Sequence, residues 1–321
     1  ILIFLLFLYY IDFFVKLYYN FAMKEFKIHE LSKEEKVIYY IKSKFPNMSS
    51  SSLYKAFRNK DIKINGKRIS DTNTLVKNND TICIYLNDEI LFNLPKQLYI
   101  PYEDENILIA YKPQGIISNY EKETNTFEPS FEEYVKKFKG SNIFICHRLD
   151  TNTSGLIIFA KNETTYMSIL NGFKAGYINK EYIAYVYDSN FSKDYYHYEN
   201  YILKDERTGF SKIYNQFVND SQKIITDIYV QKKYKKENYA ILKVLIHTGK
   251  THQIRALLSS INHPIIGDSK YGRNDINKHF KKYRQLLFAT KYSFNFNKND
   301  FLHYLNNICI TLDESYYKDK L

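Results

Sequence analysis

The amino-acid sequence predicts an α+β protein with two domains, and three observations support this prediction. Within residues 23–90, two stretches with helical spacing of apolar residues lead into a hairpin signal, which is typical of a small mixed domain. Residues 91–101 contain two prolines and little periodicity, as a linker does. From residue 102 to residue 321, strands are interspersed with helices without another such break, which predicts one larger domain.

The first 22 residues are dominated by an apolar run, Ile1 to Ile11, which Asp12 interrupts. A membrane span needs about 20 apolar residues, so this run is too short and too interrupted to predict one. A signal peptide would start with basic residues and end at small ones, and neither feature is present. Met23 opens an ordinary polar sequence. We expect residues 1–22 to be an upstream extension that is not native to the protein, with a weak membrane anchor as the alternative.

Two helices are predicted in residues 33–58. The first follows from the apolar spacing of Val37, Ile38, Tyr40 and Ile41. The second begins in a run of serines, which are good N-caps, and it places three apolar side chains on one face: Leu53, Ala56 and Phe57. Its Lys55 and Arg58 are then left to solvent.

A hairpin follows these helices. Ile62 and Ile64 alternate with a lysine and lead into Asn65-Gly66, the strongest short hairpin signal. A further strand is predicted from Thr81 to Leu86. Four basic side chains lie around the second helix and the hairpin and could contact phosphate groups without reading sequence: Lys55, Arg58, Lys67 and Arg68. The alternative is a small basic domain whose lysines are merely solvated.

The larger domain is predicted to contain strands separated by turns and by one capped helix. Asn162 can cap a helix that ends near Gly176. The predicted strands span residues 107–111, 143–146, 156–160, 182–187, 224–230 and 239–246.

The overall composition is ordinary for a globular protein. Hydrophobic residues make up 45% of the chain and charged residues 25%, which argues against disorder and against a multi-span membrane protein. The net charge of +11 is carried almost entirely by lysine, which an AT-rich genome favours, so charge alone does not indicate a nucleic-acid partner. The three cysteines include no Cys-x-x-Cys pair, which argues against a disulfide framework and a cysteine-rich zinc site and favours a reducing compartment.

Three polar segments carry the candidate chemistry. In the first, residues 147–155, a loop between two apolar strands presents Arg148 and Asp150. The alternative is a polar turn whose aspartate only caps backbone amides. In the second, residues 248–255, Thr251 can cap a short helix that carries Arg255 inward, where it would orient the Asp150 carboxylate. In the third, residues 180–186, Tyr182 could be a core aromatic or a platform for a base.

Other cofactor sites are not indicated by these segments. Gly249-Lys250-Thr251 lacks the upstream glycine of a phosphate-binding P-loop. His252 and His263 have no third ligand at a sensible spacing, so we predict no metal site.

Together the segments resemble the RluA-type pseudouridine synthases. The family hallmark His-Arg-Leu-Asp-x-x-Thr-Ser-Gly-Leu is present without a change at residues 147–156. The other family motifs follow in order: Lys-Pro-x-Gly at 112–115, Lys-x-Tyr-x-Ala-x-Val at 180–186, Thr-Gly-Arg-Thr-His-Gln-Ile-Arg at 248–255 and Gly-Asp-x-x-Tyr-Gly at 267–272. One departure is Lys250, which replaces the usual arginine. Residues 23–90 resemble the S4 RNA-binding domain through Ile62-Lys-Ile-Asn-Gly-Lys67 and Asn79-Asp80, although Lys36 stands where that pattern prefers arginine.

The resemblance implies the isomerisation of uridine to pseudouridine in RNA, by a catalytic domain built on a bent, largely antiparallel mixed sheet. No cofactor or metal is implied. Asp150 corresponds to the essential carboxylate, Tyr182 to the residue that stacks on a flipped uracil and is a proposed proton acceptor, and Arg255 to the partner of Asp150. The implied substrate-binding residues are Arg148, which would occupy the vacated base stack, Lys112, His147, Lys250 and His252.

The S4-like domain favours ribosomal RNA of the large subunit (23S) as the target. Transfer RNA is the alternative, and a non-catalytic RNA-binding factor in ribosome assembly is a second class of function, against which the intact catalytic residues speak. We expect a cytoplasmic monomer with RNA as its partner and without membrane attachment.

Overall fold

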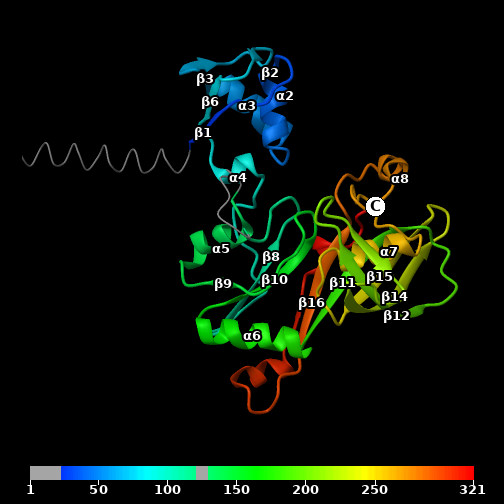
Figure 1. The fold of residues 1–321 in the computed structure, drawn as a ribbon. Helices are drawn as coiled ribbons and strands as arrows, with labels where there is room; N and C mark the ends of the chain where they lie inside the picture. Colours follow the sequence, from blue (N-terminus) through cyan, green and yellow to red (C-terminus); the bar gives the residue numbers. More distant parts are fainter. Residues whose placement is uncertain (1–22, 121–128) are drawn as a thin grey trace, which may run out of the picture. The chain divides into compact units, whose positions relative to one another are not determined.

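The computed structural model describes residues 23–120 and 129–321, which fold as two compact units that meet in sequence between residues 97 and 98 (Figure 1). The expectation about residues 1–22 therefore lies outside the described residues. Within the described ranges, every helix is too short or too polar to cross a membrane.

The first unit is built on two short helices, α2 (Val37–Lys44) and α3 (Ser50–Asn59). The Ser49 side chain caps α3 by accepting a hydrogen bond of 3.0 Å from the Ser52 amide, as the serine run predicts. Leu53, Ala56 and Phe57 are buried, which confirms the predicted apolar face of this helix. Lys60 ends α3 in the left-handed conformation at φ 60°.

A four-stranded antiparallel sheet packs with these helices in the order β1-β6-β3-β4. The bounds are β1 (Lys24–Lys27), β3 (Ile62–Ile64), β4 (Lys67–Ile69) and β6 (Thr81–Ile84), and a separate pair joins β2 (Glu35–Lys36) to β5 (Leu75–Val76). Asn65 and Gly66 turn the β3–β4 hairpin at φ 48° and 80°, which confirms the hairpin signal. The short helix α4 (Asp88–Leu91) follows, and the Phe92 ring packs against Phe45 with 5.6 Å between centroids.

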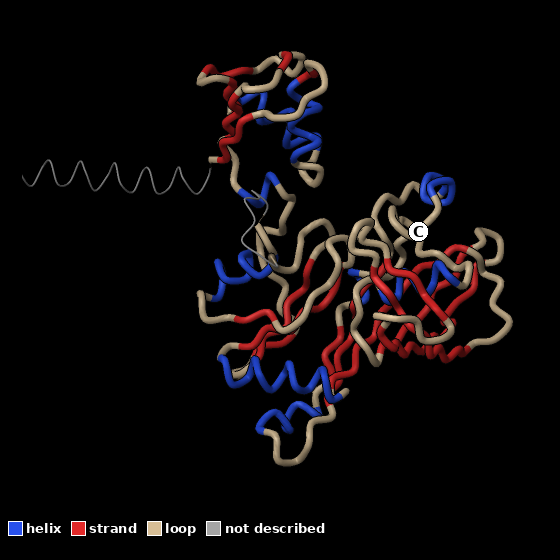
Figure 2. The backbone as a smooth tube through the Cα atoms, in the orientation of Figure 1, coloured by secondary structure: helices blue, strands red, loops and turns tan. Residues whose placement is uncertain are grey.

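The second unit is dominated by a sheet of eleven strands among the described residues, in the order β13-β12-β14-β15-β11-β16-β10-β8-β7, with β17 on β16 and β9 on β10 (Figures 1 and 2). The bounds are β7 (Tyr102–Glu103), β8 (Ile107–Lys112), β9 (Phe144–Ile145), β10 (Ser154–Ala160), β11 (Ile178–Tyr187), β12 (Tyr195–Lys204), β13 (Ser211–Tyr214), β14 (Gln222–Tyr234), β15 (Tyr239–Ile246), β16 (Leu287–Phe294) and β17 (Cys309–Thr311). Neighbours are antiparallel except β10 and β16, so the predicted large mixed sheet is present.

The parallel pair β10–β16 depends on a glycine. Gly155 lies opposite Ala289 at φ +129°, and a Cβ atom on Gly155 would approach the Ala289 carbonyl oxygen to 2.2 Å. Only glycine combines this conformation with so close an approach of two backbones. The contact holds the start of β10, and with it the loop of residues 147–153, against the centre of the sheet.

The described residues of the second unit form six helical segments besides the sheet: α5 (Phe131–Lys139), α6 (Glu163–Ala175), α7 (Gln253–Ser260), α8 (Asn274–His279) and the 3-10 helices η1 (Phe301–Asn307) and η2 (Glu314–Tyr316). Helix α6 begins at its cap Asn162 and ends at Gly176, as predicted. The prediction that Thr251 caps α7 is wrong. The N-cap is His252, in the left-handed conformation, and its side chain makes no capping hydrogen bond. The Gln253 side chain folds back over the preceding loop, where its Oε1 atom accepts hydrogen bonds from the Thr248 hydroxyl at 2.9 Å and the Lys250 amide at 3.2 Å.

Candidate functional site

A cavity of about 940 Å³ opens in the second unit, between the ends of β9, β10 and β11 and the start of α7. Seven of the eight predicted catalytic and substrate-binding residues line it: His147, Arg148, Asp150, Tyr182, Lys250, His252 and Arg255. The structure thus brings together three motifs, and its Asp150 and Arg255 are 105 residues apart in sequence.

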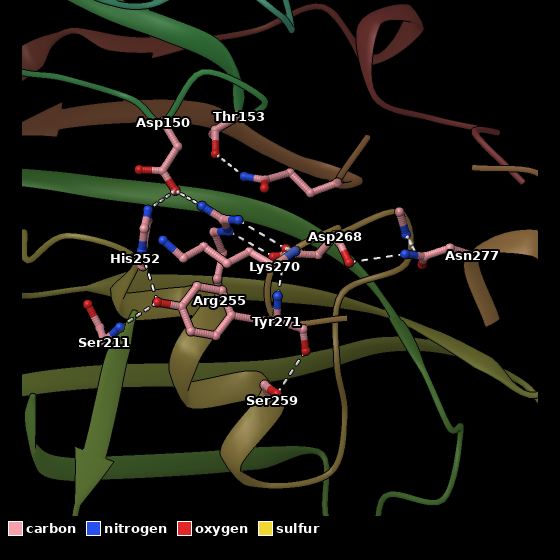
Figure 3. A network of polar contacts seen from close by, with 12 residues as sticks. Asp150, Thr153, Ser211, His252, Arg255, Ser259, Asp268, Lys270, Tyr271 and Asn277 are labelled. Carbon is pink, nitrogen blue, oxygen red and sulfur yellow. Dashed lines mark hydrogen bonds and ion pairs between the residues drawn. The ribbon is translucent and has the colours of Figure 1, made fainter. Parts of the chain in front are cut away.

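Asp150 is held by Arg255, which is itself held by Asp268 (Figure 3). The Arg255 Nη1 atom donates to Asp150 Oδ2 at 2.7 Å, while Nε and Nη2 donate to Oδ2 and Oδ1 of Asp268 at 2.7 and 3.0 Å. The Asp268 side chain is completely buried, whereas that of Asp150 is 27% exposed. The guanidinium therefore makes a bidentate contact with the buried Asp268 carboxylate and orients the accessible Asp150 carboxylate with a single hydrogen bond.

The charges of this triad reinforce each other. Burial alone would lower the pKa of Arg255, but its hydrogen bonds and charge interactions with Asp268 and Asp150 raise the pKa above its ordinary value. Burial would likewise raise the pKa of Asp268, and the hydrogen bonds from Arg255 bring it below the usual range. Arg255 and Asp268 are consequently both ionised, which gives Asp150 a permanent cationic neighbour.

The loop that carries Asp150 is fastened from several sides. The Ser118 hydroxyl donates to the Leu149 carbonyl at 2.7 Å and accepts from its amide at 3.0 Å. The Gln285 side chain donates to the Thr153 hydroxyl at 2.6 Å. These bonds fix the loop on both sides of Asp150, as a preorganised site requires.

Lys112 is the predicted substrate-binding residue that the structure does not bring into the cavity. It is fully buried, and its ammonium donates to the carbonyl oxygens of Pro113, Ile116 and Thr151 at 3.0, 2.7 and 3.0 Å. Burial lowers its pKa to about 7, with the Asp150 charge opposing this shift. Lys112 thus ties the Lys-Pro-x-Gly turn to the loop that carries Asp150.

Tyr182 lies on β11 with its side chain almost completely buried, at 6% exposure, and it forms part of the cavity wall. Burial and the Asp150 charge raise its pKa well above the ordinary value. At neutral pH the side chain is therefore a neutral phenol with an apolar ring toward the cavity.

His147 is a neutral residue that joins the loop to the sheet. Its Nε2 atom accepts a hydrogen bond from the Ile158 amide at 3.1 Å and lies 3.0 Å from the Tyr292 hydroxyl. Burial and the nearby Lys180 charge lower its pKa to about 3. A side chain with its Nε2 atom engaged in this way can present only its ring edge and Nδ1 to a ligand.

Among the described residues, five cationic side chains and one acidic side chain line the cavity. Besides Arg148, Lys250 and Arg255, the cations are Lys180 and Lys204, which sequence reasoning missed. Burial lowers the pKa of Lys180 to about 8, and its ammonium lies 4.9 Å from the centroid of the Phe173 ring. Lys180 opens the Lys-x-Tyr-x-Ala-x-Val motif, and Asp268 belongs to Gly-Asp-x-x-Tyr-Gly. Their places in these motifs could have identified both as site residues.

The four basic residues that are predicted to bind RNA belong to the first unit. Lys55 and Arg58 are exposed on α3, and Lys67 and Arg68 are exposed on β4. The Arg68 guanidinium lies 5.1 Å from the centroid of the Tyr85 ring, and the Lys63 ammonium lies 4.9 Å from it. Their surface is thus basic and partly aromatic.

Comparison with known proteins agrees with this geometry. Residues 106–260 match the RNA pseudouridylate synthase family. An uncharacterised RNA pseudouridine synthase of Mycoplasma capricolum is 32% identical over 308 residues, which cover 89% of this chain and 96% of that protein. Ribosomal large subunit pseudouridine synthase C of Buchnera aphidicola is 30% identical, over 84% of this chain and 92% of that protein.

The fold has a counterpart among solved structures. Human RNA Pseudouridylate Synthase Domain Containing 1 superposes with a TM-score of 0.53 at 20% identity, over 68% of this chain and 82% of that chain. This likeness concerns the fold alone, while the two sequence relatives match nearly the whole chain. The chain belongs to the RNA pseudouridine synthase family.

Proposed function

We propose that the protein converts specific uridines of large-subunit ribosomal RNA to pseudouridine, with Asp150 as the catalytic carboxylate. The observation that carries the proposal is the position of Asp150: its carboxylate lies in the wall of the cavity, is oriented by the buried Arg255–Asp268 pair, and shares the cavity with Tyr182.

The reaction breaks the bond between N1 of uracil and C1′ of the ribose, turns the base and joins C1′ to C5. The hydrogen on C5 leaves as a proton and N1 gains one, so the isomerisation needs no oxidant, reductant or energy source. The chain must therefore supply a carboxylate at the sugar or base, a surface that holds the detached base, and a proton acceptor. Asp150 and the Tyr182 ring meet the first two needs.

The raised pKa of Tyr182 bears on the third need. A buried phenol that stays protonated at neutral pH is a better hydrogen-bond donor than a proton acceptor. We therefore assign to Tyr182 the stacking of the flipped uracil, which is worth about 1–3 kcal/mol per base and offsets part of the cost of flipping.

The charge of the cavity suits an RNA strand. The excess of cationic over acidic side chains in its wall attracts a polyanion, and Arg148 and Lys250, both exposed at the cavity, suit contacts with the flanking phosphates. Lys250 in place of arginine supplies a point charge rather than a two-pronged contact.

The ribosomal target rests on two supports. The Buchnera relative is named as a synthase of the ribosomal large subunit, and the first unit has the helix pair and hairpin expected of an S4-like RNA-binding domain. We propose that residues 23–90 form this domain and that Lys55, Arg58, Lys67 and Arg68 contact RNA phosphates. On this proposal the protein acts as a monomer in the cytoplasm, where ribosomes assemble.

The test is tritium release from RNA labelled at C5 of uridine, with transcripts of 23S ribosomal RNA and of transfer RNA. We expect release from ribosomal RNA by the wild type and a loss of more than about 10²-fold in Asp150→Asn, with RNA binding retained. Asp275→Asn is the matched control, because Asp275 is an exposed carboxylate paired with Arg273 outside the cavity.

Each outcome discriminates between functions. Release from transfer RNA alone would move the substrate to that class. Tight RNA binding with no release from either transcript would contradict the enzyme proposal and favour a ribosome-assembly factor.

A further inference from the structure

His252 has a strained backbone beside the catalytic carboxylate. It is a non-glycine residue at φ 60°, at the point where the loop of residues 248–252 enters α7. This conformation directs its ring between Tyr271 and Asp150 (Figure 3). A residue held in such a conformation at a functional site is a candidate for a positioning role.

The contacts of the Tyr271 hydroxyl allow a chain of hydrogen bonds from Ser211 through Tyr271 to His252. The Ser211 amide can only donate, and it lies 2.6 Å from the Tyr271 hydroxyl oxygen, which must accept. The Tyr271 proton is then free to point to His252 Nδ1, 2.9 Å away. With Nδ1 as the acceptor of this bond, the neutral imidazole carries its proton on the other ring nitrogen, Nε2.

The other ring nitrogen, Nε2, faces the catalytic group. His252 Nε2 lies 3.9 Å from Asp150 Oδ2, the oxygen that also accepts from Arg255. That separation is longer than a hydrogen bond, and the ring also lines the cavity. The Nε2–H group can therefore serve either the Asp150 carboxylate or an oxygen of the bound nucleotide.

We propose that Ser211 and Tyr271 act as positioning residues that lock His252 in the Nε2–H tautomer, which makes His252 a neutral hydrogen-bond donor at the reacting end of Asp150. The inference rests on the catalytic role proposed for Asp150 and adds to it. It also explains the place of the β12–β13 hairpin in the site, since β13 supplies the Ser211 amide and the Ser211 hydroxyl donates to the Thr251 carbonyl at 3.1 Å.

The charges around His252 are compatible with a neutral ring. Burial lowers its pKa, the charges of Asp150 and Asp268 oppose that shift, and those of Arg255 and Lys270 add to it. The Tyr271 ring packs edge-on against the His252 ring, with 5.4 Å between centroids, and it carries no charge at neutral pH.

The first test reads the tautomer directly, by two-bond proton–nitrogen correlation spectra of protein labelled with ¹⁵N-histidine. The His252 signals are identified by their loss in His252→Gln. We expect the Nε2–H tautomer in the wild type and a mixture of tautomers in Tyr271→Phe, which keeps the ring and removes the hydroxyl. Tyr283→Phe is the matched control, because the Tyr283 side chain is 69% exposed. An Nδ1–H tautomer in the wild type, or an unchanged spectrum in Tyr271→Phe, would overturn the proposal.

The second test reads the consequence for catalysis. Gln places its amide nitrogen near the position of Nε2, whereas Asn places its own near Nδ1, so His252→Gln should retain at least tenfold more kcat than His252→Asn. Tyr271→Phe should lower kcat by about tenfold with little change in KM. Equal kcat in the Gln and Asn variants, or the reverse order, contradicts the donor role.

The two proposals can fail separately. If the wild type releases no tritium from any RNA, the proposed function fails, while the spectra still establish or exclude the tautomer. If the wild type is active but the spectra show the other tautomer, only the present inference fails.

Discussion

Asp268 does not line the cavity, yet its buried carboxylate accepts two of the three hydrogen bonds that hold the Arg255 guanidinium. Asp268→Asn leaves a buried cation with one anionic partner fewer, which costs about 3–5 kcal/mol for a buried pair. We expect a lower Tm and, in the folded fraction, a lower kcat for tritium release because Asp150 loses its fixed orientation. Asp275→Asn, in an exposed pair, should leave both quantities unchanged. An unaltered kcat in Asp268→Asn would argue against this chain of contacts.

Lys180 should impose a pH dependence on the reaction. Its pKa of about 8 lies below that of an ordinary lysine because of burial, and among the described residues no carboxylate pairs with its ammonium. The protonated form, present below pH 8, attracts the anionic substrate, so kcat/KM should fall as pH rises through about 8. Lys180→Arg should move this inflection to higher pH, and Lys180→Met should remove it. An inflection near pH 8 that persists in Lys180→Met would assign the titration to another group.

The residues of the site were only partly predictable. The motifs that contain Asp150, Tyr182 and Arg255 predict that these three side chains share one site, because the chemistry demands those residue types. They do not indicate that Lys112 is buried beneath the loop, since a lysine can either reach into a cavity or donate to backbone carbonyls behind it. Nor do they show that Asp268 completes the network, because its partner lies thirteen residues away across a turn.

At the scale of elements, local signals predicted those segments whose residues favour one conformation by themselves. The serine cap of α3, the Asn65-Gly66 hairpin and the Asn162–Gly176 limits of α6 are of this kind. In the larger domain, strands β7, β12, β13, β16 and β17 were not predicted. Strand β12 has Ile202 as its one buried apolar side chain, so its sequence lacks an alternating apolar pattern. Strand β16 is specified by its neighbours β10 and β11 rather than by its own pattern.

The contact between β10 and β16 gives a prediction at this scale. Gly155→Ala would place a methyl group 2.2 Å from the Ala289 carbonyl oxygen in a left-handed conformation, so the free energy of unfolding should fall by about 3 kcal/mol or more. Gly176→Ala is the matched control. Gly176 is also left-handed, at φ +76°, but has no atom within 4 Å of its Cβ position, and its substitution should cost about 1 kcal/mol. Urea unfolding of both variants makes the comparison, and equal losses would refute the steric argument.

At the scale of the whole molecule, binding and chemistry are assigned to different units. Replacing Lys55, Arg58, Lys67 and Arg68 by glutamine should weaken RNA binding. The slope of the logarithm of the binding constant against the logarithm of the salt concentration should become shallower by about 0.7–0.9 for each lost phosphate contact. The kcat at saturating RNA should be unchanged, because the cavity belongs to the other unit. Neutralising exposed lysines at 235, 236, 281 and 298 removes the same charge and should change the slope less. Equal slopes in the two variants would contradict the role of the first unit in binding.

The strand order also has a consequence for the synthesis of the protein. In the described sheet, β16 lies between β10 and β11, although it is made after both of them. A nascent chain that has not yet extruded residues 287–294 holds Asp150 in the loop before β10 and Arg255 on α7 after β15, but it lacks the strand that joins these two parts of the sheet. The enzyme should therefore become active only after residues 287–294 have left the ribosome, so that termination before β16 should yield fragments without catalysis.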